Sequence, residues 1–181
     1  MNASALFDLL AAAKAECGHV DYVVVGSVSV LGMSEVCAIP AGMTVSIDAD
    51  CYTLTDPPRV FDLQAKLGEG SVYHRLHGIY LDPVSPKLPT LPDGWQQRLI
   101  RIARGGVTAH FLEPNDAAVS KLARAEPRDL RWVRAGISAG LVSLPMLKLR
   151  MQTTDFLDEQ EQAAALRAIN ALELPAGDAE Y

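Results

Sequence analysis

Two aspartates separated by one residue are the first feature of this sequence that could carry chemistry. Asp48 and Asp50 lie in residues 44–52, where apolar and polar residues alternate as they do in a strand. Side chains two apart on a strand point to the same face, so the two carboxylates would lie side by side. Like charges held together favour a cation between them, and Mg²⁺ prefers oxygen ligands. The pair therefore indicates a metal site, although an Asp-x-Asp pattern alone has low specificity.

A third aspartate stands in a similar setting further along the chain. Residues 78–82 predict a short strand that ends in Asp82, because Pro83 stops it. If this strand lies beside the strand of Asp48 and Asp50, three carboxylates converge. Three carboxylates can hold the two ions that assist in-line phosphoryl or nucleotidyl transfer. The alternative is that all three are solvated aspartates at loop edges.

A glycine and a serine follow the first predicted strand. Residues 21–25 form a continuous apolar run that predicts a buried strand, and Gly26-Ser27 comes next, before a predicted helix over residues 28–37. Glycine lets the backbone approach a phosphate, and a helix N-terminus offers unpaired N–H groups. The sequence contains neither a GxGxxG pattern nor a Walker P-loop. By itself the pair therefore indicates only a turn.

The elements that must position these residues form two parts. Residues 1–112 are predicted to be α/β, with a small mixed sheet and flanking helices, and residues 113–181 are predicted to be helical. The further elements that we expect are a helix over 5–16 capped by Ser4, a helix over 60–67, a hairpin of 98–103 with 107–112, and helices over 115–125, 127–138, 144–152 and 155–172.

Composition and charge exclude several classes of protein. The chain has 181 residues, of which 49% are hydrophobic, so a sizeable core can form. No apolar run reaches the roughly 20 residues of a membrane span, and Asp8 interrupts any signal peptide, so we expect a cytoplasmic protein. Three cysteines without CxxC spacing disfavour a zinc ribbon. Residues 98–150 are basic within an acidic chain; they could meet phosphates or pair with the acidic C-terminal part.

The first part of the chain resembles the nucleotidyltransferase fold of the polymerase beta type. The resemblance rests on a strand that ends in Gly26-Ser27, a second strand with Asp48 and Asp50, and a third with Asp82. It implies that Gly26 and Ser27 bind the phosphates of a nucleoside triphosphate (NTP). It also implies that Asp48 and Asp50 bind Mg²⁺, with Mn²⁺ as an alternative ion, and that Asp82 is the third metal-binding carboxylate.

The second part resembles the nucleotidyltransferase toxins of AbiE-type toxin–antitoxin systems, over residues 91–95, 112–122 and 128–130. In that group a helical lysine, followed by an aspartate on the next helix, faces the nucleotide. The resemblance implies that Lys121 neutralises phosphate charge during the reaction, and that Asp129 positions Lys121 or the substrate. It also implies a cognate antitoxin protein as a partner.

The predicted function is Mg²⁺-dependent transfer of a nucleoside monophosphate from an NTP to an acceptor hydroxyl, with Asp82 as the base. The acceptor stays open between an RNA 3′ end, such as that of a tRNA, and a protein side chain. One alternative is an inactive nucleotide-binding or antitoxin-like module, because Thr44 stands where those toxins often carry an arginine. The other is a small-molecule nucleotidyltransferase that modifies an antibiotic, which an acidic acceptor pocket would favour.

Two further groups of residues could bind ligands. His74 and His77 are three apart and could be metal ligands on one helix face, but no third ligand is evident in the sequence. Arg124, Arg128 and Arg131 would form one basic stripe if the helix continued through Pro127. Such a stripe could contact an RNA backbone or a triphosphate, or be a solvated helix face.

Overall fold

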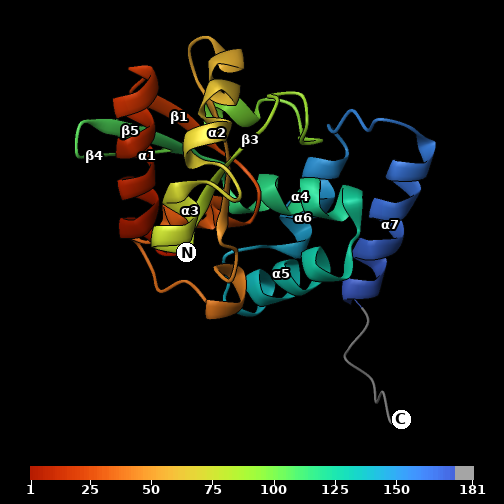
Figure 1. The fold of residues 1–181 in the computed structure, drawn as a ribbon. Helices are drawn as coiled ribbons and strands as arrows, with labels where there is room; N and C mark the ends of the chain where they lie inside the picture. The colour runs from red at the N-terminus through yellow and green to blue at the C-terminus, as the bar shows by residue number, and fades with distance from the viewer. Residues whose placement is uncertain (174–181) are drawn as a thin grey trace. The chain divides into compact units, whose positions relative to one another are not determined.

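The computed structural model describes residues 1–173 and divides the chain into two compact units. The α/β unit consists of Met1–Pro89 and Gly94–Glu113, and the helical unit of Thr90–Asp93 and Pro114–Tyr181. Figure 1 shows the sheet and its helices in the first and the helix bundle of the second. The predicted fold class is confirmed, because the α/β unit holds a mixed five-stranded sheet with flanking helices.

The sheet has the strand order β3-β2-β1-β5-β4. β1 is antiparallel to β2 and parallel to β5, β2 is parallel to β3, and β4 and β5 form the predicted hairpin. The sheet therefore mixes both pairings, and its central strand is the valine-rich segment that is buried on both faces. The strands are β1 (Asp21–Val24), β2 (Asp48–Thr53), β3 (Tyr80–Pro83), β4 (Ile100–Arg104) and β5 (Val107–Phe111).

Helix α1 (Ala3–Cys17) covers part of the sheet with a buried leucine face, and its Phe7 ring meets Phe111 of β5 edge-on at 6.4 Å. The prediction of Ser4 as its N-cap is wrong. Asn2 has extended backbone angles and its side chain accepts the N–H of Ala5, whereas Ser4 already lies inside the first turn. With Asn2 as the cap, the helix starts at Ala3, two residues earlier than we expected.

Two segments predicted as α-helices are mainly 3₁₀ helices. Residues 28–37 correspond to η1 (Ser27–Met33), where valines disfavour the α-helix and Gly32 lies against Phe111 of β5. Residues 60–67 correspond to η3 (Pro57–Leu63) and a single α-helical turn, α2 (Gln64–Leu67). The structure adds helix α3 (Val72–His77), which the sequence analysis did not predict, and the short η2 (Ala41–Met43) and η4 (Trp95–Arg98).

The helical unit is built around α4, which packs against the three helices that follow it. Thr90–Asp93 belongs to this unit through two backbone contacts. Pro92 forms an isolated antiparallel β-bridge with Thr154, and the Asp93 N–H donates to the Thr153 carbonyl over 2.8 Å. The last helix begins at residue 159, four residues later than expected. The helices are α4 (Pro114–Arg124), α5 (Pro127–Ser138), α6 (Leu144–Met151) and α7 (Glu159–Glu173).

The three arginines are divided between two helices, because the helix does not continue through Pro127. Ala125 has φ 53, in the left-handed region, and Pro127 starts a new helix. Arg124 therefore ends α4, whereas Arg128 and Arg131 lie on α5. Within residues 1–173, no helix has the length and apolar character needed to cross a membrane.

Candidate metal centre

The parallel pairing of β2 with β3 brings the three aspartates together. Asp50 lies opposite Asp82 in this register, and Asp48 is two residues before Asp50 on the same face. One carboxylate oxygen from each of the three residues lies within 4.8 Å of the others, and all three side chains are half-buried. The sequence analysis expected the three carboxylates to converge if their two strands were neighbours. The strands are neighbours, and the carboxylates converge.

The backbone at Gly26 lies directly against this cluster. Gly26 has φ 64, and a Cβ atom built on it would overlap a carboxylate oxygen of Asp50. The neighbouring Val25 N–H donates to the Asp50 carbonyl over 2.9 Å, which ties the end of β1 to β2. Ser27 follows as the first residue of η1. The Gly26-Ser27 turn and the carboxylates therefore share one corner of the sheet.

The charges of the cluster act on each other. Burial raises the pKa of Asp82, and the negative charges of Asp48 and Glu69 raise it further. The Ser46 hydroxyl donates to Asp48 Oδ1 over 2.8 Å and stabilises that carboxylate. Three hard oxygen donors at this spacing fit Mg²⁺ or Mn²⁺ and disfavour soft metals. The residues present can therefore hold a divalent ion.

Lys121 and Asp129 meet in the core of the helical unit. The Lys121 ammonium lies 3.1 Å from Asp129 Oδ1, and both side chains are 2% exposed. Arg124 donates to both carboxylate oxygens of Asp129, over 2.8 and 3.0 Å. The Lys121 ammonium also lies 4.9 Å from the centre of the buried Trp132 ring. Asp129 therefore joins two cations, one of them buried.

The surroundings of Asp129 reverse the effect of its burial. Burial alone would raise the pKa of its carboxyl group. The hydrogen bond from Arg124 and the charges of Lys121 and Arg124 outweigh burial and hold that pKa below its ordinary value. Asp129 is therefore an ionised carboxylate at neutral pH, and it neutralises part of the charge on Lys121.

The two histidines do not form a metal site in the described part of the chain. His74 stacks on Tyr80 with ring centres 4.7 Å apart, and His77 stacks on Tyr73 at 4.2 Å. Neither histidine belongs to a group of three potential metal ligands within residues 1–173. Tyr80, the partner of His74, lies two residues before Asp82 on β3, so their side chains share one face of the sheet.

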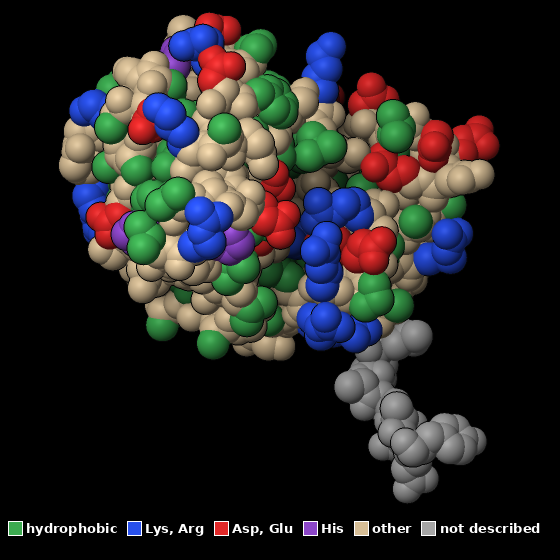
Figure 2. Space-filling model, in the orientation of Figure 1, with side chains coloured by type: hydrophobic (Ala, Val, Ile, Leu, Met, Phe, Trp, Pro, Cys, Tyr) green, Lys and Arg blue, Asp and Glu red, His purple; other side chains and the backbone are tan. Residues whose placement is uncertain are grey.

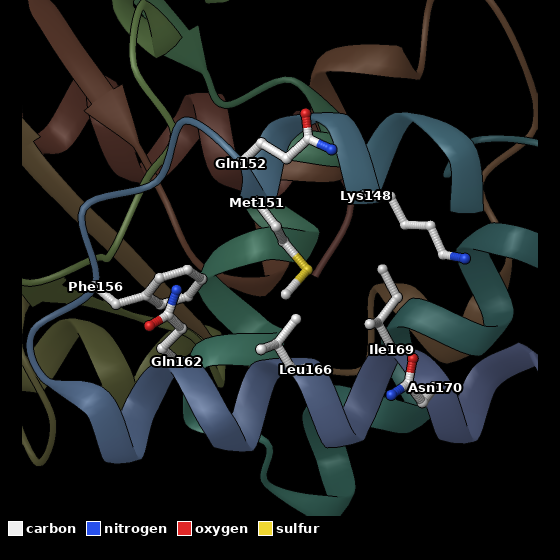
Figure 3. A pocket seen from close by; sticks show the side chains of 8 residues that line it. All are labelled: Lys148, Met151, Gln152, Phe156, Gln162, Leu166, Ile169 and Asn170. Carbon is white, nitrogen blue, oxygen red and sulfur yellow. The ribbon is translucent and has the colours of Figure 1, made fainter.

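The helical unit also contains a cavity of about 330 Å³ between α6 and α7. Figure 3 shows Met151, Leu166 and Ile169 directed into it from these two helices, with Phe156 closing one end. None of the residues that the sequence predicted for the site lines this cavity. The lining residues are Lys148, Met151, Gln152, Phe156, Gln162, Leu166, Ile169 and Asn170.

A protein family described as "Nucleotidyltransferase of unknown function (DUF6036)" matches residues 4–172, which is nearly the whole chain. The chain belongs to this family. Membership in DUF6036 supports the nucleotidyltransferase superfamily to which the sequence pattern pointed. Neither curated proteins nor solved structures give a match to the chain. The acidic triad of this DUF6036 member is thus a metal-binding candidate in a nucleotidyltransferase family.

Proposed function

We propose that the protein is a Mg²⁺-dependent nucleotidyltransferase that transfers a nucleoside monophosphate from an NTP to an acceptor hydroxyl. The observation that carries this proposal is the convergence of Asp48, Asp50 and Asp82 at one corner of the sheet. Membership in a nucleotidyltransferase family gives the convergence a chemical context. Without that context, three carboxylates close together would indicate only a cation site.

Each carboxylate has a role in the proposed reaction. Asp48 and Asp50 hold the ions, and Asp82 completes the ligand set and accepts the proton of the acceptor hydroxyl. Mg²⁺ at this site supplies positive charge that compensates the triphosphate and the developing charge of the transition state. The acceptor oxygen forms a bond to the α-phosphorus, the bond from that phosphorus to the β-phosphate bridge breaks, and pyrophosphate leaves.

Gly26 and Ser27 are proposed to bind the triphosphate. The support is steric, because at Gly26 any side chain would occupy the space beside the Asp50 carboxylate. A phosphate bound beside the Asp50 carboxylate would need that space, and backbone approach of this kind requires glycine. The 3₁₀ form of η1 makes the helix dipole a small contribution, so we assign the binding to backbone and hydroxyl groups at this turn.

Lys121 and Asp129 are proposed to contribute on the nucleotide side. The 3.1 Å ion pair supports a positioning role for Asp129, since the carboxylate restricts where the ammonium of Lys121 can lie. In this role Lys121 neutralises phosphate charge, as the resemblance to the AbiE-type toxins implies. Asp129 would act through Lys121 and would not touch the substrate.

The proposed acceptor is an RNA 3′ end, such as that of a tRNA, or a protein side chain. A role in a toxin–antitoxin pair with a cognate antitoxin, as the resemblance suggests, belongs to the same proposal. Figure 2 shows Lys and Arg side chains gathered over the helical unit, where Arg128, Arg131 and Arg134 of α5 are exposed. Exposed arginines of this kind favour contact with a nucleic-acid backbone.

The test is incubation of the purified protein with Mg²⁺ and each of four labelled NTPs. Total RNA, lysate protein and an aminoglycoside mixture serve as three separate acceptors. The Asp48→Asn/Asp50→Asn variant runs beside Asp62→Asn, which changes an exposed aspartate paired with Arg59. We expect label in RNA or protein, a loss of about 10³-fold in the double variant, and no change in Asp62→Asn.

Three outcomes would contradict the proposal. Equal label in the wild type and the double variant would show that the triad is not the site. NTP binding without transfer to any acceptor would favour the inactive module, for which Thr44 is the sequence argument. Label confined to the aminoglycoside would establish the small-molecule enzyme.

A further inference from the structure

Tyr80 is a fourth side chain on the carboxylate face of the sheet. It lies opposite Asp48 in the register of β2 with β3, and two residues before Asp82 on the same strand. Neighbouring positions in a parallel pair carry their side chains on the same face, so the Tyr80 ring lies beside the triad. The ring is half-buried, which leaves part of it open to a ligand.

His74 extends this aromatic surface and is itself fixed in place. Its ring lies 4.7 Å from that of Tyr80, at an interplanar angle of 50°. The Gly70 N–H donates to His74 Nδ1 over 3.0 Å, and the backbone N–H of His74 donates to the capping hydroxyl of Ser71, also over 3.0 Å. The Gly70 contact orients the imidazole and the Ser71 cap fixes the backbone that carries it, so a ligand would meet a preformed pair of rings.

The strand order assigns the two sides of the triad to different ligands. Across the sheet the order is β1 with Gly26 at its end, then β2 with Asp48 and Asp50, then β3 with Asp82 and Tyr80. The proposed triphosphate turn is on the β1 side of the carboxylates, and the aromatic pair is on the β3 side. The aromatic pair therefore lies on the side of Asp82, the residue proposed to accept the proton of the acceptor.

We propose that Tyr80 and His74 form the acceptor subsite, and that the acceptor is an RNA whose 3′-terminal base stacks on Tyr80. The inference rests on the proposed nucleotidyltransferase function and names the acceptor class. Aromatic side chains bind single-stranded nucleic acid by stacking on any base. A base stacked beside Asp82 would place the hydroxyls of its own ribose near the residue proposed to take their proton.

The charges around Tyr80 add two requirements to this subsite. Burial raises the pKa of Tyr80, and the negative charges of four nearby carboxylates raise it further, namely those of Asp48, Glu69, Asp82 and Asp50. In Figure 2, acidic side chains lie next to a histidine in the region of α3. RNA phosphates would be repelled there, so acceptor binding requires Mg²⁺ at the triad. Glu69 is not in the triad and can accept a hydrogen bond from the amino group of a base.

The second stacked pair of α3 provides a matched control. Tyr73 and His77 stack at 4.2 Å on the same helix, but burial and then Asp8 of α1 raise the pKa of Tyr73. Tyr73 therefore lies in surroundings different from those of Tyr80. His77 is exposed and stacks on Tyr73, so His77→Ala removes an equivalent ring that does not belong to the subsite.

The experiment measures binding and transfer separately. Fluorescence anisotropy follows a labelled single-stranded oligoribonucleotide of about eight nucleotides, with Mg²⁺ and then with EDTA. Transfer assays give the KM for the same RNA, and an equilibrium binding titration gives the Kd for NTP. We expect Tyr80→Ala to weaken RNA binding and raise the RNA KM about tenfold, with NTP affinity unchanged. Tyr80→Phe keeps the ring face and is expected to restore the RNA binding that Tyr80→Ala loses. His77→Ala is expected to match the wild type, and EDTA to abolish RNA binding.

The outcomes separate this inference from the proposed function. Transfer to RNA with an unchanged KM in Tyr80→Ala would overturn the subsite and leave the function standing. RNA binding that requires Tyr80, without transfer, would keep the subsite and overturn the activity. Equal weakening in Tyr80→Phe would show that the hydroxyl acts, and not the ring face. Transfer to protein or to a cationic small molecule, with no RNA binding, would overturn the inference on acceptor class.

Discussion

Asp82 and Asp129 are the same residue type in opposite electrostatic settings. Asp82 shares its face of the sheet with Asp48, and burial followed by like charge raises the pKa of its carboxyl group. Asp129 is buried beside Lys121 and also pairs with the half-exposed Arg124, and these cations lower its pKa although burial opposes them. The α/β unit thus gathers negative charge, whereas the helical unit neutralises it locally.

The difference separates a cluster of like charges from a carboxylate whose charge is neutralised by cations. Like charges held by a rigid sheet destabilise the fold until a cation binds, so such a cluster indicates a ligand. A buried carboxylate with two cationic partners contributes to stability only while all partners remain. Removing one charge should therefore have opposite effects on the free energy of unfolding in the two units.

The largest expected effect is the loss of stability in Asp129→Asn. This change leaves the Lys121 ammonium, which is 2% exposed, without its carboxylate, at a cost of about 3 kcal/mol. Urea unfolding followed by the fluorescence of Trp132, in a Trp95→Phe background, measures it in the helical unit. Asp82→Asn, followed through Trp95 in a Trp132→Phe background, is expected to raise or preserve stability in metal-free buffer. Loss of stability in both variants would break the comparison.

An effect nearly as large is expected from Mg²⁺ on the α/β unit alone. An ion that binds only the folded triad adds about 2.7 kcal/mol at one hundred times its Kd. Thermal unfolding at pH 7, followed through Trp95 and Trp132 separately, should show a rise in Tm for the Trp95 signal. The Asp48→Asn/Asp50→Asn variant is expected to lose that rise. A shift of equal size at Trp132 would place the ion elsewhere.

The smallest expected effect is an opposite response of the two units to acid. Asp129 has a lowered folded pKa, so its contribution is present above its ordinary value of 3.8 and is lost as the pH falls through the lowered pKa. Asp82 has a raised folded pKa, so in metal-free buffer stability is gained as the pH falls through that pKa towards 3.8. Urea midpoints between pH 6 and pH 3 measure both. Parallel curves would contradict the comparison.

Much of the α/β unit could be predicted because its signals are local. The alternation of apolar and polar residues predicted the strand of Asp48 and Asp50, and the valine run predicted β1. The hairpin was predicted from the turn residues Arg104-Gly105-Gly106. The convergence of Asp82 was different, because it depends on which strands pair and in which register. From the sequence we could say only that the carboxylates converge if the two strands pair. The structure shows that β2 and β3 do pair.

The remaining differences have physical causes that no local pattern shows. In η1, Gly32 lies close to Phe111, a contact between residues that are far apart in sequence. The contact of Lys121 with Asp129 joins two helices that are separated at Ala125, whose left-handed backbone is unusual for alanine. Tyr80 was missed because an aromatic residue on a strand is ordinarily read as packing.

Strand β3 carries both Asp82 and Tyr80, and it is the outermost strand on its side of the sheet. It has four residues, and its last, Pro83, has no N–H to donate. Short edge strands open locally at a smaller free-energy cost than that of global unfolding, and their amides exchange hydrogen sooner. Heat inactivation should therefore precede loss of the fold. An ion bound by all three carboxylates would delay the inactivation, because it would link β3 to β2.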